Sequence, residues 1–199
     1  MDRNPHKGFT LIELVVAMAV AAVLVGVAVP SFTSAIKNNR LQSQTRELQM
    51  ALLKARSEAV KGRDDMTICA RATDATCGTD WDNGWLVFID RVIVTTEAVP
   101  VPESVDDILR IAMATPTGIE ISAKGSVDRT AAGVTSRDYI RYDAFGRTDW
   151  TNGTFTVCDD RGNTHAKSLN IALTGDIRPG RSGSDDEIPH DAFNTDVDC

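Results

Sequence analysis

The sequence has few aromatic residues, little positive charge and few cysteines, and each shortage excludes a class of protein. Only 6% of the 199 residues are aromatic, and 21 Lys and Arg stand against 28 Asp and Glu, for a formal net charge of -7. A general nucleic-acid coat or a basic membrane-surface binder is excluded, because polyphosphate partners require clustered positive charge. A disordered acidic chain is also excluded, since 42% of the residues are hydrophobic and can build a core.

Cysteine and histidine are too scarce and too scattered for most catalytic sites. The 4 cysteines suit an oxidising compartment but are too few for a disulfide-dominated small protein. No Cys-x-x-Cys pair is present, which argues against thiol catalysis. None of the histidines, which are His6, His165 and His190, lies in a recognisable nucleophile motif. We therefore expect that the protein is not an enzyme and that it has no cofactor and no metal site.

The sequence does contain one long apolar run near its start. Every residue from 14 to 29 is apolar or Gly, and the run extends back to Phe9, which gives 21 residues before Pro30. A helix of that length covers about 31 Å, the hydrocarbon thickness of a bilayer. Because Arg3 and Lys7 precede the run, the positive-inside rule keeps this end in the cytoplasm. The run predicts one membrane-spanning helix with the rest of the chain outside the cytoplasm.

A cleaved secretory signal peptide is the alternative, because Ala17, Ala19 and Ala21 offer A-x-A spacings. The apolar run continues well beyond these alanines, whereas a cleavage site should follow the apolar core. Glu13 also interrupts the run, and a carboxylate at membrane depth costs about 2.5–3.5 kcal/mol on insertion scales. Since a plain anchor has no use for that charge, Glu13 is a candidate functional residue.

The residues around Glu13 form a pattern in which every element has a fixed offset. The stretch Lys7-Gly8-Phe9-Thr10-Leu11-Ile12-Glu13 has a basic leader that ends in Gly, then Phe, then Glu at the fifth position after the Gly. It closely resembles the class III signal of type IV pilins and type II secretion pseudopilins. The resemblance implies that a prepilin peptidase cuts between Gly8 and Phe9 and methylates the new amino group of Phe9. It also implies that Glu13 pairs with the N-terminal ammonium of a neighbouring subunit's Phe9.

After Pro30, which permits a kink or local melting, the pattern becomes that of an amphipathic helix. Spacings of four and three residues place one set on a single helix face: Leu41, Thr45, Leu48, Leu52, Ala55 and Ala59. Gly62 and the Asp64-Asp65 pair mark the helix end. The other face has an excess of positive charge, which fits either solvent or anionic neighbours in a filament.

The remainder of the chain is rich in short β-type runs separated by Gly, Asp, Asn and Pro. We expect strands at 66–71, 85–91, 108–114, 139–145, 154–158 and 167–173. Two prolines exclude a central strand from 92–107, which we expect to be an exposed loop. The fold prediction is α+β, with a long N-terminal helix packed on an antiparallel β-rich head. The expected parts are a leader at 1–8, a transmembrane half-helix at 9–30, an amphipathic half-helix at 31–63 and a periplasmic or extracellular head at 64–199.

Motifs in the predicted head extend the resemblance to the GspH/FimT family, which includes pseudopilin H of type II secretion and the FimU- and FimT-like minor pilins. The motifs are Trp81-Asp82-Asn83-Gly84-Trp85-Leu86-Val87-Phe88, Arg56-Ser57-Glu58-Ala59-Val60, Phe145-Gly146-Arg147 and Leu173-Thr174-Gly175. We expect Asn83-Gly84 to form a tight turn with positive φ. We also expect Trp85 and Phe88 to pack in the core or against the helix.

The resemblance implies a minor pilin of a type IV pilus that joins the assembly-initiating or tip complex. Its implied partners are other major and minor pilins, the prepilin peptidase and the inner-membrane assembly platform. It would lie in the inner membrane with a periplasmic head and later in the pilus at the cell surface. A minor pseudopilin H of the type II secretion system is the first alternative, and a DNA-binding minor pilin for natural transformation is the second. We expect partner contacts at 92–107 and at the acidic tail, 185–199.

The four cysteines allow three disulfide pairings. Outside the cytoplasm we expect Cys69–Cys77, which bracket a loop, and Cys158–Cys199. The second bond would tie down a polar tail that lacks enough apolar residues to hold itself.

DNA and calcium binding have only partial motifs. DNA-binding members of the family have a G-R-x-R motif near the C-terminus, and here Asp176 replaces its first arginine. An acid beside a phosphate lowers affinity, which leaves Arg178 and Arg181 as candidates for a weak, salt-sensitive contact. For calcium, Asp80-x-Asp82-x-Gly84 lacks the remaining ligands of a calcium loop, and the acidic tail is either a solvated loop or a weak calcium site.

Gly8→Val should block leader removal, because the predicted cleavage site requires Gly at that position. Mass spectrometry of the purified protein should then find residues 1–8 still attached. A mature protein of normal size would contradict the assignment of the class III signal.

Overall fold

The computed structural model describes residues 10–91, 101–125, 139–148, 151–181, 188–192 and 194–199. The chain divides into two compact units, residues 1–39 and 40–199. The predicted leader, Phe9, most of the 92–107 loop and residues 185–187 and 193 of the acidic tail lie outside the described residues.

One helix, α1, runs from Leu11 to Gly62 and contains 52 residues. The predicted helix and its end at Gly62 are therefore confirmed. The helical backbone continues through Pro30. Arg63 ends the helix in the left-handed region, with φ 58°, and its N–H donates to the carbonyl oxygen of Ala59 at 2.9 Å.

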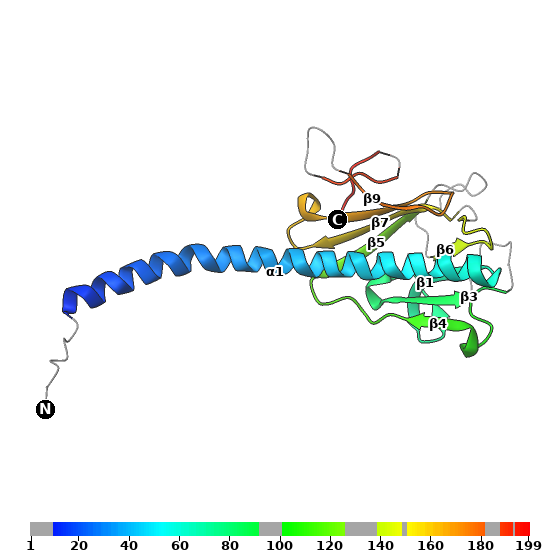
Figure 1. The fold of residues 1–199 in the computed structure, drawn as a ribbon, viewed down its shortest axis with the longest axis horizontal. Helices are drawn as coiled ribbons and strands as arrows, with labels where there is room; N and C mark the ends of the chain where they lie inside the picture. The colour runs from blue at the N-terminus through cyan, green and yellow to red at the C-terminus, as the bar shows by residue number, and fades with distance from the viewer. Residues whose placement is uncertain (1–9, 92–100, 126–138, 149–150, 182–187, 193) are drawn as a thin grey trace, which may run out of the picture. The chain divides into compact units, whose positions relative to one another are not determined.

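The described residues of the second unit form two antiparallel sheets (Figure 1). In the first sheet, β1 lies between β3 on one side and both β2 and β6 on the other, and β4 pairs with the far side of β3. Its strands are β1 (Met66–Thr73), β2 (Thr76–Cys77), β3 (Trp85–Ile89), β4 (Ile108–Ile111) and β6 (Tyr139–Tyr142). The second sheet has the order β5 (Ile119–Gly125), β7 (Gly153–Asp159), β8 (Lys167–Ile171) and β9 (Ile177–Pro179). The α+β prediction of a long helix on antiparallel sheets is confirmed.

Each of the six predicted strand regions contains a strand, but four of the predicted ranges extend too far. β3, β4, β6 and β8 end two or three residues before the predicted limits, and turns follow β6 and β8 closely. The strands β2, β5 and β9 were not predicted. In β5 the alternation is present, since Ile119 and Ile121 are buried while Glu120 and Ser122 are exposed. β2 and β9 have only 2 and 3 residues and are defined by pairing with a neighbour.

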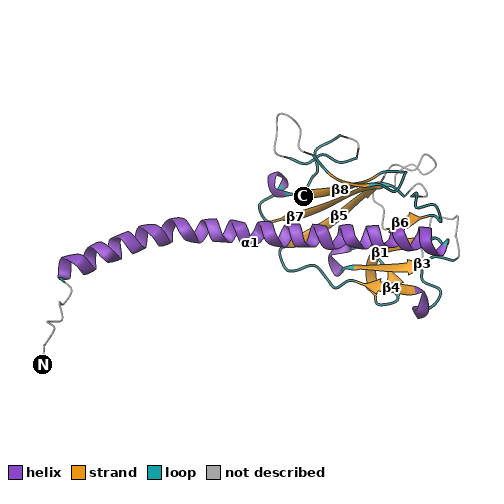
Figure 2. Cartoon of the chain, in the orientation of Figure 1, coloured by secondary structure: helices purple, strands orange, loops and turns teal. Residues whose placement is uncertain are grey.

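The second half of α1 and both sheets enclose one hydrophobic core (Figure 2). The predicted helix face is buried, apart from Thr45, which is half-buried, and Ala51 is buried with it. This face shares the core with both sheets, through residues such as Ile68, Val87, Ile121, Phe155 and Leu169. Burying each Leu-sized side chain contributes about 1.5–3 kcal/mol. The helix face therefore joins two sheets whose described strands do not pair with each other.

Trp85 and Phe88 are both buried, but on opposite faces of the first sheet. Trp85 belongs to the core shared with α1, whereas Phe88 lies in a second cluster with Cys69 and Leu86. A spacing of three residues along a strand places side chains on opposite faces, so only Trp85 can face the helix. The turn that we predicted at Asn83-Gly84 is the end of the 3-10 helix η1 (Trp81–Asn83). Of these two residues only Gly84 has a positive φ, of 90°.

The structure contains two disulfide bonds, and they join the pairs that we expected. Cys69 bonds to Cys77 and links β1 to β2, while Cys158 in β7 bonds to the last residue, Cys199. The N–H of Cys199 also donates to Asn163 Oδ1 at 3.0 Å. The end of the tail is thus held on the second sheet by a covalent bond and a hydrogen bond.

Removing the long disulfide should destabilise the protein more than removing the short one. The Cys158–Cys199 bond spans 41 residues and the Cys69–Cys77 bond spans 8. On the loop-closure model the losses are about 4 and about 2.5 kcal/mol, because a longer loop restricts the unfolded chain more. Thermal unfolding of the paired Cys→Ser variants in detergent would measure both losses. Equal losses, or a larger loss for the short bond, would contradict the expectation.

Candidate functional site

Almost all the described helix residues of the first unit are exposed, and most of them are apolar. Large apolar side chains lie on every side of the helix between Leu11 and Ile36, and they are at least half exposed. A helix that is apolar all round needs lipid or other protein to cover it. By length and composition α1 contains a stretch that could cross a membrane.

Glu13 lies in the first turn of α1, next to the residue that caps the helix. The Thr10 hydroxyl accepts a hydrogen bond from the backbone N–H of Glu13 at 3.3 Å, and the Thr10 carbonyl accepts from the N–H of Leu14 at 3.2 Å. The Thr-x-x-Glu spacing is that of a capping box, and a negative charge also suits the helix N-terminus. Glu13 therefore has a position suited to starting the helix, which sequence reasoning missed. The predicted cleavage residues, Gly8 and Phe9, lie outside the described residues.

Three motifs that are far apart in the sequence meet at the guanidinium group of Arg56. Its Nε donates to the carbonyl oxygen of Gly146 at 2.9 Å, and its Nη2 donates to that of Thr174 at 3.0 Å. Its Nη1 donates to the carboxylate of Asp176 at 3.0 Å. These contacts form what we call the Arg56 joint: Arg56, Gly146, Thr174, Gly175 and Asp176. One side chain of α1 is thereby bonded to the turn after β6 and to the turn after β8.

Two glycines allow the turns of the Arg56 joint to approach each other. Gly146 and Gly175 have positive φ, 75° and 78°. A Cβ on Gly175 would overlap the carbonyl oxygen of Gly146, and a Cβ on Gly146 would lie 2.9 Å from Cγ2 of Val60. The F-G-R and L-T-G motifs therefore correspond to a close contact between two turns and the helix.

Asp176 supplies the carboxylate that pairs with Arg56 in the Arg56 joint. The hydrogen bond from Arg56 holds the pKa of the Asp176 carboxyl below its ordinary value. The Thr174 hydroxyl also donates to this carboxylate, at 3.3 Å. The sequence indicated only that Asp176 weakens a phosphate site. Its partner was missed because Arg56 lies 120 residues earlier in the chain.

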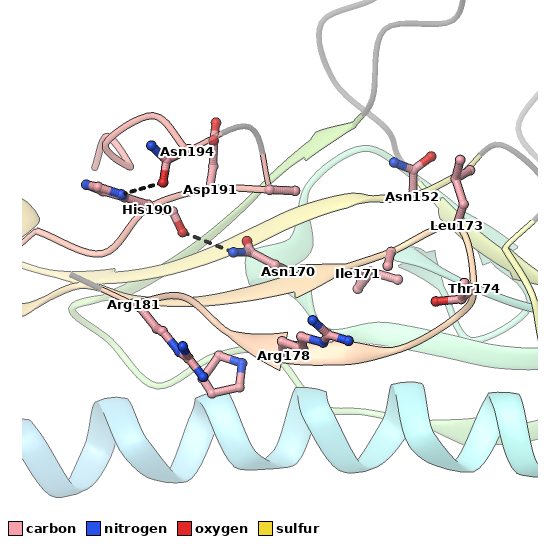
Figure 3. Close-up of a pocket in the computed structure, with 13 residues that line it drawn as sticks. Asn152, Asn170, Ile171, Leu173, Thr174, Arg178, Arg181, His190, Asp191 and Asn194 are labelled. Atoms are coloured by element: carbon pink, nitrogen blue, oxygen red, sulfur yellow. Dashed lines mark hydrogen bonds between the residues drawn. The ribbon is translucent and has the colours of Figure 1, made fainter. Parts of the chain in front are cut away.

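Arg178 and Arg181, the candidate DNA contacts, lie beside the same hollow of about 1070 Å³, next to β8 and β9 (Figure 3). Asn170 and His190 also line it, and the amide of Asn170 donates to the carbonyl oxygen of His190 at 3.1 Å. An Asp176 oxygen lies 3.8 Å from Arg178 Nη2, which offsets part of the positive charge. The hollow is therefore mixed in charge and rich in amide groups.

The Asp80-x-Asp82-x-Gly84 stretch forms a turn. The Asp80 carboxylate accepts from the N–H of Asp82 at 3.0 Å, and so caps the 3-10 helix η1. Asp82 accepts from the N–H of Ile121 at 2.6 Å, which links this turn to β5, and its burial raises the pKa of its carboxyl. Among the described residues, no group of three or more His, Cys, Asp or Glu side chains is placed to hold a metal ion.

Comparison with known proteins gives two family matches. The family described as "Type II transport protein GspH" matches residues 44–175, more than half of the chain, and the "Prokaryotic N-terminal methylation motif" matches residues 3–29. Among solved structures, two crystal forms of the type IV minor pilin FimU of Pseudomonas aeruginosa (strain PAO1) are similar, with 25% and 24% sequence identity and a TM-score of 0.47 for each. Both alignments cover 71% of this chain, and they cover 89% and 93% of the FimU chains. No curated protein sequence matches.

Arg56→Lys should destabilise the protein by about 2 kcal/mol, because a lysine cannot reach three acceptors at once and leaves carbonyl groups without a partner. Urea unfolding in detergent would measure the loss. Arg147→Lys is the matched control, since Arg147 is mostly exposed and pairs with Asp143 in its own turn, and we expect a change within about 0.5 kcal/mol. Equal losses for the two variants would contradict the role of the Arg56 joint.

The pH dependence of stability tests the Asp176 part of the Arg56 joint. Because the pKa of Asp176 is lower in the folded than in the unfolded chain, its contribution is present above the unfolded value of about 4 and is lost as the pH falls through the folded pKa. Asp176→Asn should therefore be less stable than the parent protein at neutral pH, and the difference should vanish in acid. A difference that persists in acid would show that the charge is not what stabilises the contact.

Proposed function

The chain belongs to the GspH family of type IV pilin-like proteins, and on this basis we propose that it is a minor pilin of a type IV pilus. The family consists of structural pilins and pseudopilins, so its chemistry is assembly. The observation that carries the proposal is the succession of an N-terminal methylation motif at residues 3–29 and a GspH domain at 44–175, with one helix running from the first into the second.

In this proposal the chain has the parts expected from its sequence. Residues 1–8 are a leader, 9–30 span the inner membrane once, 31–63 continue the helix, and 64–199 form a periplasmic head. The prepilin peptidase cuts between Gly8 and Phe9 and methylates Phe9. The assembly platform then moves the mature protein into a filament of major and minor pilins, in the complex that starts assembly or lies at the tip.

The exposed apolar half of α1 supports this pathway, because an apolar surface is compatible first with lipid and later with the packed helices of a filament. In the membrane, lipid covers its side chains, and in a filament, the helices of other subunits cover them. In that second environment Glu13 pairs with the methylated ammonium group of a neighbouring Phe9. An unpaired carboxylate is costly in lipid, so this pairing favours the filament over the membrane.

Mass spectrometry of filaments sheared from the surface of the native host tests the proposal. We expect a peptide that begins with N-methylated Phe9 in that fraction. A precursor that retains residues 1–8 in every cell fraction would overturn the pilin function.

Pseudopilin H of a type II secretion system is the second candidate, and the description of the matched family favours it. The same membrane helix and head would then serve a short periplasmic filament. Finding the mature peptide only in the membrane fraction, while other minor pilins appear in the sheared fraction, would favour this alternative.

DNA capture receives less support. Asp176 stands at the position of an arginine in the motif of DNA-binding relatives and is bonded to Arg56. Arg178 and Arg181 alone would give a weak contact that salt disrupts. Restoring arginine with Asp176→Arg would also remove the partner of Arg56, so a gain in DNA affinity is expected to come with a loss of stability.

Glu13→Gln separates the two roles of Glu13. Glutamine also serves at the third helical position of a capping box, but it cannot form the ion pair with Phe9. We expect the variant to insert in the membrane and lose its leader as usual, yet to be depleted from sheared filaments at least tenfold. Thr10→Ala is the control, because it removes the cap and keeps the charge. Normal incorporation of Glu13→Gln would mean that Glu13 acts through the helix start and not through pairing.

A further inference from the structure

Phe145 is a large aromatic residue that lies in the open. It exposes 79% of its surface, whereas the other described aromatic side chains of the second unit, such as Trp85 and Tyr142, are buried in the core or half-buried. Contiguous apolar surface on a soluble domain commonly marks a binding site, and aromatic residues dominate the energy of such sites.

The turn that bears Phe145 is rigid. The N–H of Asp143 donates to the Arg147 carbonyl, and the N–H of Gly146 donates to the Asp143 carbonyl, both at 2.8 Å. The Asp143 carboxylate accepts from the N–H groups of Phe145 and Arg147, both at 2.9 Å. Burial works to raise the pKa of Asp143, but these bonds and the Arg147 guanidinium outweigh it and lower the pKa. The carbon at the centre of that guanidinium lies 5.3 Å from the centre of the Phe145 ring.

The Arg56 joint fixes this turn to the helix and to the second sheet. Gly146 accepts the hydrogen bond from Arg56, so the residue next to Phe145 cannot shift without breaking the Arg56 joint. A backbone turn that is held in place before binding loses little conformational entropy when a partner arrives. Phe145 is thus presented in the manner of an interface anchor.

Two further exposed apolar residues lie around the Arg56 joint. Val60 lies against Gly146, and the carbonyl of Leu173 accepts from the N–H of Thr148 at 3.1 Å. Both side chains are about half exposed. We call Val60, Phe145, Arg147 and Leu173 the Phe145 surface.

In three ion pairs around the Phe145 surface the basic side chain is more exposed than its acidic partner, whereas in the Arg56–Asp176 pair of the joint the arginine is the less exposed member, 31% against 45%. In the pair of Arg147 with Asp143, the arginine side chain is 64% exposed and the aspartate 21%. The same holds for Arg178 with Asp176 and for Lys61 with Glu58. Exposed ion pairs contribute little to stability and can exchange partners. Arg147, Arg178 and Lys61 are therefore the more exposed charges here, and we call these three side chains the basic rim.

We propose that the Phe145 surface docks the head of a different, leader-processed pilin, which offers an apolar pocket bordered by Asp or Glu side chains. The Phe145 ring requires an apolar pocket on the partner, and the basic rim favours acidic side chains around that pocket. This inference rests on the proposed function as a filament subunit, since it takes the partner from the same filament.

The experiment places a photo-crosslinking phenylalanine analogue at position 145 of the full-length chain in the native host. Met113, which is 77% exposed and lies beyond the end of β4, is the matched control position. We expect an adduct with another processed pilin, at least tenfold more abundant from position 145 than from position 113. Adding Arg147→Gln to the probe at 145 should lower the adduct several-fold, because the basic rim is reduced.

Equal adducts from both positions, an adduct with a second copy of this chain, or adducts that contain no pilin would overturn the inference. The N-terminus of the same protein is analysed in parallel. If Phe9 is exposed and methylated but position 145 gives no specific adduct, the docking surface is wrong and the pilin function stands. If residues 1–8 are retained, the function and the docking surface both fail. Unchanged thermal unfolding of Phe145→Ser would show that the side chain is not needed for the fold.

Discussion

Burial of one face of α1, from Leu41 to Ala59, is the interaction on which the second unit depends. The described strands of the two sheets form separate ladders, and only isolated hydrogen bonds such as that from the N–H of Ile121 to Asp82 connect them directly. Each sheet covers its apolar side with the same row of leucines and alanines, and the alanines let the strands approach the helix closely. The helix is thus the shared core element of the head, and its residues from Leu41 to Ala59 must keep an apolar face that packs against both sheets.

The Arg56 joint adds direction to this apolar packing. Burial alone allows a helix to slide or rotate by small amounts, because hydrophobic contacts are not directional. A guanidinium group that satisfies two carbonyl oxygens and a carboxylate, at distances of 2.9–3.0 Å, restricts both movements. The motifs that contain Arg56, Gly146 and Gly175 are far apart in the sequence but describe this one contact. We therefore infer that their role is structural, and that the same contact fixes the turn that displays Phe145.

The helix meets opposite demands along its length. Before Asn39 its exposed side chains are mainly apolar and suit lipid or a bundle of helices, whereas after Arg40 only one face is apolar and the rest suits water. A filament subunit needs both properties, since the same molecule is first held in a membrane and then packed beside other subunits. Glu13 is placed at the capped start of the apolar part, and in the function that we propose the same carboxylate also pairs with a neighbouring subunit.

Local patterns in the sequence were enough to predict α1, its buried face, the strands β1, β3, β4, β6, β7 and β8 and the α+β fold, because periods of 3.6 and 2 residues depend only on near neighbours. The strand β5 was missed although its buried and exposed residues alternate. The fixed offsets around Gly8, Phe9 and Glu13 and the W-x-x-G-W motif also identified the family. The strands β2 and β9 escaped prediction because two or three residues have no period of their own and become strands only beside a partner. The role of Asp176 and the exposure of Phe145 could not be predicted either. Asp176 pairs with a residue 120 positions away. Phe145 lies in an apolar-rich run that we predicted to be a strand, and only the fold shows that the strand ends before Phe145 and leaves its side chain exposed. Local chemistry determined the elements of this protein, whereas contacts across long stretches of chain decided which side chains support the fold and which remain available to a partner.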